Sequence, residues 1–240
     1  MRLGRLVGLG VVAVSTWMAC SGGSSSSSSG GSSSSSSSSG GASSSGGGSG
    51  GYNVAGTFEA WTRGAGFTLE AQACGNADGG ASMCVTLGTA DISATGQFSL
   101  NLSTPSPAVQ QEAKPEIANC TGAITLTPST ARGVEVGFKI MQGTTLVTGV
   151  SWQNRDPNAG LATGDKLGIL FYADQPATLM GSLMCGGGTT TVGFDNVAYV
   201  AGFNPGYMDY TNVNITSLPP SITASIRGGS LAELKWWTRN

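Results

Sequence analysis

The feature that most constrains this chain is a long serine- and glycine-rich segment near its N-terminus. Residues 21–51 consist of serine and glycine apart from Ala42. These side chains are too small to offset the conformational entropy lost on ordering, so we expect a disordered tether. A Gly/Ser coil of about 31 residues has a root-mean-square reach of roughly 30 Å. The segment therefore sets a short N-terminal region apart from a single folding region, Tyr52 to Asn240.

The first twenty residues have the pattern of a secretory signal. Two arginines precede an uncharged apolar run, Leu6 to Ala19, which ends at Cys20. This run is too short to span a hydrocarbon core, which needs about 20 apolar residues. A basic start, a short apolar run and a small residue before the cleavage point predict a signal peptide over residues 1–19.

The position of Cys20 gives this N-terminus a resemblance to bacterial lipoprotein signals, in which that cysteine becomes the lipidated first residue. The chain departs from the usual pattern at Trp17 and Met18, where such signals carry leucine and a small residue. The resemblance implies acyl chains on Cys20, a tether over residues 20–51 and a lipid anchor in the cell envelope, at the outer membrane or the cell surface. The alternative is an ordinary cleaved signal in which Cys20 stays unmodified.

Charged side chains are sparse, and their distribution argues against two classes of partner. The chain has 11 Lys and Arg, 13 Asp and Glu, and no His. Lys and Arg form no cluster after residue 51. The electrostatic footprint of a nucleic-acid binder is therefore missing, and so is a polybasic membrane patch.

The remaining cysteines indicate disulfides. Besides Cys20 there are four, an even number in a chain that we expect in an oxidising compartment. Four cysteines allow three pairings. We expect Cys74–Cys84 and Cys120–Cys185, because the Gly-, Asn- and Asp-rich residues between the first two are typical of a loop that a disulfide closes. None of the cysteine spacings is that of a zinc site.

The pattern of the folding region predicts an all-β fold. Short runs rich in Val, Ile, Thr, Phe and Tyr alternate with Gly, Asn, Pro and Ser, which is typical of an antiparallel β-sandwich with an Ig-like or surface-module-like arrangement. Residues 52–240 form one such domain, or two β lobes. Helical spacing occurs only over Ala108–Ala118, where Pro115 interrupts it. The predicted strands are Val54–Trp61, Phe67–Ala73, Gln97–Leu102, Ala123–Thr127, Val134–Ile140, Leu146–Ser151, Lys166–Ala173, Thr178–Met184, Val197–Phe203, Met208–Ile215, Ile222–Ile226 and Leu231–Trp237.

Two segments resemble exported β-domains. Val54–Leu102 resembles the small β-sandwich modules of bacterial surface proteins, in which a glycine turn delivers a phenylalanine to the core; Gly96 and Phe98 take those places here. The portion from Gly181–Cys185 to the terminal Lys-Trp-Trp is similar to exported β-domains of uncharacterised bacterial lipoproteins. The resemblance implies fold and location, and it carries no catalytic motif.

The absence of histidine removes many activities. Ser-His-Asp and Cys-His catalysis need an imidazole base, and zinc hydrolases and His-ligated copper or iron sites need an imidazole ligand. We therefore predict no catalytic residue, no cofactor and a non-enzymatic binding or structural role, with an envelope protein or a polysaccharide as partner. The alternatives are a carbohydrate-binding module and a glycan hydrolase that uses paired carboxylates. The candidate acids are Glu59, Glu70, Glu135, Asp165, Asp174, Asp195 and Asp209.

One loop carries a weak calcium pattern. Oxygen-bearing side chains recur at Asn154, Asp156, Asn158 and Asp165, and calcium takes six to eight oxygen ligands from such a loop. Proline at position 157 and alanine in place of the usual glycine at position 159 depart from the pattern. An ordinary turn is the simpler interpretation, because these residues favour turn geometry.

Aromatic residues supply the other candidate site. Such rings stack on sugar rings or anchor a partner, although packing in the core is the alternative. Trp236 and Trp237 are adjacent, so on a strand they point to opposite faces. The candidates are Trp61, Trp152, Trp236, Trp237, Tyr207 and Tyr210.

Overall fold

The structure is a computed structural model that describes residues 51–75, 83–114 and 120–239. The chain divides into two units, Met1–Ser36 and Ser37–Asn240, and the described residues all belong to the second. The predicted signal peptide (1–19), the lipidated Cys20 and the tether up to residue 50 lie outside the described residues.

The prediction of an all-β fold is confirmed. The part of the chain that the structure describes contains strands and short 3₁₀ turns, and no α-helix. The strands are β1 (Tyr52–Thr57), β2 (Phe67–Gly75), β3 (Met83–Ile92), β4 (Gln97–Leu102), β5 (Gln111–Glu112), β6 (Cys120–Thr127), β7 (Arg132–Gln142), β8 (Thr145–Gln153), β9 (Lys166–Ala173), β10 (Ala177–Cys185), β11 (Thr190–Tyr199), β12 (Gly202–Asn214), β13 (Ser221–Gly228) and β14 (Lys235–Thr238). The 3₁₀ turns are η1 (Pro107–Val109), η2 (Pro157–Ala159) and η3 (Gly186–Gly188).

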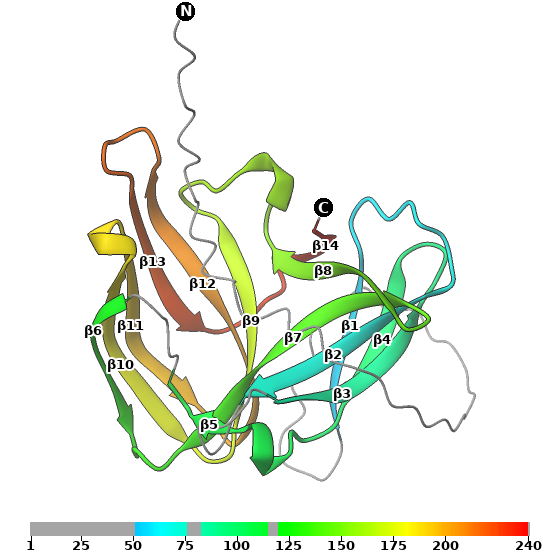
Figure 1. The fold of residues 1–240 in the computed structure, drawn as a ribbon, viewed down its shortest axis with the longest axis horizontal. Helices are drawn as coiled ribbons and strands as arrows, with labels where there is room; N and C mark the ends of the chain where they lie inside the picture. The colour runs from blue at the N-terminus through cyan, green and yellow to red at the C-terminus, as the bar shows by residue number, and fades with distance from the viewer. Residues whose placement is uncertain (1–50, 76–82, 115–119, 240) are drawn as a thin grey trace, which may run out of the picture. The chain divides into compact units, whose positions relative to one another are not determined.

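A 12-stranded sheet and a two-stranded sheet form a sandwich-like arrangement (Figure 1). The large sheet runs β3-β2-β7-β8-β9-β12-β13-β11-β10-β6, with β14 added to β8 and β5 to β7, and β1 pairs with β4. The expectation of a purely antiparallel sandwich needs one correction. Strands β11 and β13 are parallel. After β11 the chain crosses over so that β12 pairs with β9, and β13, antiparallel to β12, then fills the place between β12 and β11.

Two predicted segments differ from the observed elements. The strand predicted at Val197–Phe203 is broken, because β11 ends at Tyr199 and β12 begins at Gly202, whose φ is +105°. Asn204 fixes this turn by accepting a hydrogen bond from the Val200 N–H. The helical spacing at 108–118 yields only the η1 turn and strand β5 up to residue 114.

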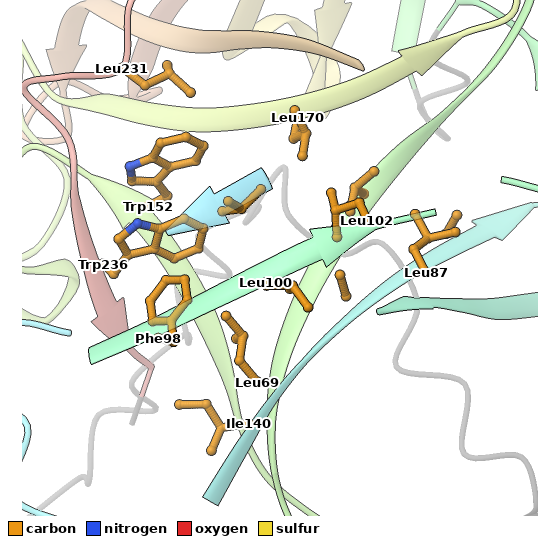
Figure 2. Close-up of a cluster of buried hydrophobic side chains, with 14 of the residues drawn as sticks. Leu69, Leu87, Phe98, Leu100, Leu102, Ile140, Trp152, Leu170, Leu231 and Trp236 are labelled. Carbon is orange, nitrogen blue, oxygen red and sulfur yellow. The ribbon is translucent and has the colours of Figure 1, made fainter. Parts of the chain in front are cut away.

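The main core lies between the two sheets (Figure 2). Strand β4 alternates, with Phe98, Leu100 and Leu102 buried and the residues between them exposed. The Trp236 ring stacks on Trp152 with centroids 4.7 Å apart and meets the edge of Phe98 at 5.1 Å. A Cβ on Gly56 would lie 2.6 Å from the Trp236 ring, so glycine allows β1 to approach this indole.

A second apolar layer lies on the other face of the large sheet. Leu170 of β9 enters the main core. Three side chains on neighbouring strands, Tyr210, Ala224 and Val192, share a row of the register and are also buried. Strand β9 carries buried side chains on both faces, Leu170 on one and Ala173 on the other, which explains its near-continuous apolar run. Strand β12 has its buried side chains on the second face only.

Both predicted disulfides are confirmed. Cys74–Cys84 joins β2 to β3, and Cys120–Cys185 joins β6 to β10, each between residues that are directly opposite in the register. The predicted role of the glycine turn before β4 is confirmed as well. Gly96 has a φ of +82°, and Phe98 is buried two residues later.

Candidate functional site

The six aromatic candidates do not form one site. Trp152 and Trp236 lie in the main core, and Tyr210 is buried on the opposite face of the large sheet. Trp61 and Trp237 are half-buried, and each satisfies its indole N–H on a backbone carbonyl, of Gly64 and Gln153 respectively. The prediction that Trp236 and Trp237 face opposite ways is confirmed, because only Trp236 enters the core. Of the six, Tyr207 lines the cavity described below.

The candidate calcium loop is held together by its own hydrogen bonds. Asn154 Oδ1 accepts from the Lys166 N–H at 2.8 Å, and Asp156 Oδ1 accepts from the Asn158 N–H at 2.8 Å, where it caps η2. Asp165 Oδ2 accepts from Arg155 Nη2 at 2.9 Å. Within residues 51–75, 83–114 and 120–239, no group of three or more His, Cys, Asp or Glu side chains is arranged to hold a metal ion. These hydrogen bonds are those of an ordinary turn, which was the simpler of the two interpretations of this loop.

Most of the candidate acids are paired with bases rather than with each other. The salt bridges join Glu59 to Lys235, Glu70 to Lys139, Asp165 to Arg155 and Asp209 to Arg227. Asp174 accepts a hydrogen bond from the backbone N–H of Arg132, and Asp195 is exposed. None of these contacts joins two of the candidate acids, which is the arrangement that a carboxylate-pair hydrolase requires.

Glu135 is the exception among these acids. It lies on β7 directly opposite Phe171 of β9, and the Phe171 ring stacks on Tyr199 at 4.8 Å. Burial raises the pKa of Glu135 to about 7, although Arg239 acts in the other direction. Burial likewise raises the pKa of Tyr199 to about 12. Glu135 thus has the proton affinity of a general acid, and the charged group that acts on its pKa is a guanidinium rather than a second carboxylate.

A cavity of about 320 Å³ lies between the sheet and the β13–β14 connection. We call it the Tyr207 cavity. Its walls are Lys166 of β9, Tyr207 of β12, and Ser230, Ala232, Glu233 and Leu234 of the connection.

The register places the polar groups of the Tyr207 cavity. On β9 and β12, Lys166 lies opposite Asp209 and Gly168 lies opposite Tyr207. Arg227 of β13 flanks Tyr207 on the other side and forms a salt bridge with Asp209. Because Gly168 has no side chain, the β9 residue directly opposite Tyr207 places no side chain beside the Tyr207 ring.

Electrostatics hold one wall of the cavity in place. Lys166 Nζ lies 3.0 Å from Glu233 Oε2 and 5.4 Å from the centroid of the Tyr207 ring. The hydrogen bond that Lys166 Nζ donates to Glu233, together with the negative charge of Glu233, raises the pKa of Lys166. The cavity therefore combines a cation, an anion, a hydroxyl group and an aromatic ring, a set that suits a small ligand rich in hydroxyl groups.

Sequence reasoning named Tyr207 but missed the other polar residues of the cavity, Lys166, Ser230 and Glu233. The missed residues belong to β9 and to the connection before β14, and they meet because β14 returns to pair with β8. No local pattern of the sequence signals this meeting.

The described residues contain no helix that is long and apolar enough to cross a membrane. No protein-family model, curated protein or solved structure matches this chain.

Proposed function

We propose that this chain is a lipid-anchored extracytoplasmic protein with a non-enzymatic binding role at the cell envelope. The observation that carries the proposal is the use of the cysteines. Four of the five form two disulfides, which indicates an oxidising compartment. The fifth, Cys20, directly follows the predicted signal and begins the predicted tether.

Fatty-acid labelling tests the anchor. Cells expressing the full-length chain are fed an alkyne fatty acid, and the label on the purified protein is measured for the parent, for Cys20→Ser and for Ser21→Ala as a matched neighbouring control. We expect label on the parent and on Ser21→Ala, and none on Cys20→Ser. An unlabelled parent, or a labelled Cys20→Ser variant, would overturn the proposal.

The Tyr207 cavity favours carbohydrate as the ligand class. An aromatic ring packs against the C–H face of a sugar, and the Lys166–Glu233 pair offers both a donor and an acceptor to hydroxyl groups. The size of the cavity, about 320 Å³, is near the lower end of the range for small-molecule sites. The hydrolase alternative, which needs two converging carboxylates, stays an untested prediction.

Affinity electrophoresis through gels that contain soluble polysaccharides tests the carbohydrate proposal. We expect the parent to be retarded in at least one gel, Tyr207→Phe to keep most of the retardation, and Tyr207→Leu to lose it because the ring is gone. Lys166→Gln should weaken the retardation. Lys114→Gln, which breaks the exposed Lys114–Glu112 pair elsewhere, should not. Equal mobility of all variants in every gel would count against carbohydrate binding.

A further inference from the structure

The hairpin between β12 and β13 projects from the large sheet (Figure 1), and its tip carries exposed apolar side chains. Leu218 is 93% exposed and Ile215 is 62% exposed, and Pro219 is exposed beside them. Single exposed leucines are ordinary on protein surfaces, but two large apolar residues within four positions on one projecting loop form a concentrated apolar point.

The tip is held in one shape by its own polar side chains. Asn214 Oδ1 accepts hydrogen bonds from the N–H groups of Thr216 and Ser217, at 3.2 and 3.1 Å. The Ser217 hydroxyl lies 2.8 Å from the carbonyl oxygen of Pro219 and 3.1 Å from that of Asn214, and its one proton is donated to either of them. The apolar side chains are therefore exposed by an organised turn.

These hydrogen bonds also lower the cost of taking the tip out of water. A backbone N–H that loses water without gaining a partner is costly in a lipid environment. The N–H groups of Thr216 and Ser217 already have a partner, and Pro219 and Pro220 have no N–H. The tip thus satisfies much of its backbone internally while its apolar side chains stay in solvent.

The hairpin also carries no ionisable side chain that would resist burial in lipid, apart from the phenol of Tyr210 at its base. Residues 210–226 contain no Asp, Glu, Lys or Arg, and the nearest charged groups are Asp209 and Arg227 at the base of the two strands. Charged side chains are the ones most strongly excluded from the hydrocarbon region. An uncharged hairpin is not specific to membranes. Together with the internally hydrogen-bonded backbone of the tip, however, the absence of charge lowers the cost of burying the tip in lipid.

We propose that Ile215 and Leu218 insert into the surface of the lipid bilayer that holds the anchor. This inference rests on the proposed lipid on Cys20 for proximity, since the predicted Ser/Gly tether, with an expected root-mean-square reach of roughly 30 Å, would keep the domain near the headgroups. A protein partner fits less well, because a stable protein interface buries about 800 Å² per partner, and a hairpin tip offers a point rather than a broad surface. Insertion would fix the orientation of the domain relative to the membrane, which a flexible tether alone would not do.

The experiment uses the full-length lipidated chain in phosphatidylcholine vesicles. Tryptophan replaces either Leu218 (Leu218→Trp) or Leu146 (Leu146→Trp), a matched leucine that is 54% exposed next to the β7–β8 turn. The emission added by each new tryptophan over that of the parent is measured, together with its quenching by brominated acyl chains. Flotation of the parent with the vesicles tests the anchor separately.

We expect the Leu218→Trp signal to shift to shorter wavelength and to lose at least half its intensity to brominated lipid, and the Leu146→Trp signal to do neither. A Leu218→Trp signal that stays water-like while the parent floats would overturn insertion and leave the anchor standing. Equal quenching at both positions would mean unspecific adsorption and would also overturn it. Shielding of position 218 from aqueous quenchers without quenching by brominated lipid would assign the tip to a protein contact instead.

Discussion

At the scale of single residues, Glu135 makes the stability of the domain depend on pH. Its pKa rises from an ordinary value of 4.5 to about 7 in the folded chain, because burial disfavours the carboxylate. The folded state therefore holds this proton more tightly than the unfolded chain does. The stabilisation is fully present below pH 4.5 and is lost as the pH rises through about 7.

We predict that Glu135→Gln flattens this pH dependence. Glutamine imitates the protonated acid, so at pH 8 the variant should exceed the parent in free energy of unfolding by roughly 1–3 kcal/mol, while at pH 4.5 the two should be similar. Urea unfolding at both pH values measures the difference. Glu112→Gln, at the exposed ion pair with Lys114, is the control and should change little at either pH. A Glu135→Gln variant that is less stable than the parent at pH 8 would contradict the assignment.

At the scale of elements, β14 is a short strand that closes the main core. It pairs with β8 through four residues, and its Trp236 side chain is 4% exposed and packs on Trp152 and Phe98. The next residue, Trp237, faces the other side and is only half-buried. The same strand thus provides a test position and its control.

We predict that Trp236→Ala lowers the free energy of unfolding by about 3–5 kcal/mol, because truncation leaves a cavity among rings that cannot collapse into it. Trp237→Ala should cost clearly less, roughly 1–2 kcal/mol, for lost packing and the lost hydrogen bond to Gln153. Denaturant unfolding measures both. Equal losses would mean that Trp236 does not close the core as described.

The two disulfides also act at the scale of elements, because each joins two strands, and they close chain segments of different length. The separations are 10 residues for Cys74–Cys84 and 65 for Cys120–Cys185. In the chain-entropy model these loops are worth about 2.7 and 4.3 kcal/mol respectively. We predict that the double variant Cys120→Ala, Cys185→Ala loses more stability than Cys74→Ala, Cys84→Ala, as measured by thermal unfolding under oxidising conditions. The reverse order would show that the effect lies in native packing rather than in the unfolded chain.

At the scale of the whole molecule, local alternation predicted the strands better than their arrangement. Gln97–Leu102 and Lys166–Ala173 were predicted with the observed bounds, since alternating or β-rich runs and flanking turn residues define them locally. Strand β3 was missed. The strand predicted at Leu231–Trp237 is shorter than expected, because Leu231 to Leu234 form a turn closed by a hydrogen bond of 2.9 Å.

The candidate sites could not be predicted to the same degree. The Tyr207 cavity joins Lys166, Tyr207 and Glu233, which only the pairing of β9 with β12 and of β14 with β8 brings together. The parallel contact of β11 with β13 is likewise a property of the complete sheet. The Cys74–Cys84 pairing could be predicted because the residues between these two cysteines are typical of a loop that a disulfide closes, and Cys120–Cys185 is then the pair that remains.

The proposed anchor ties these scales together, because it determines where the cavity and the hairpin tip act. Mass spectrometry of the N-terminal peptide from membrane-purified protein tests it most directly. The account predicts a mature chain that begins at Cys20 and carries the mass of several acyl chains. An unmodified N-terminus, or a chain that begins at another residue, would contradict it.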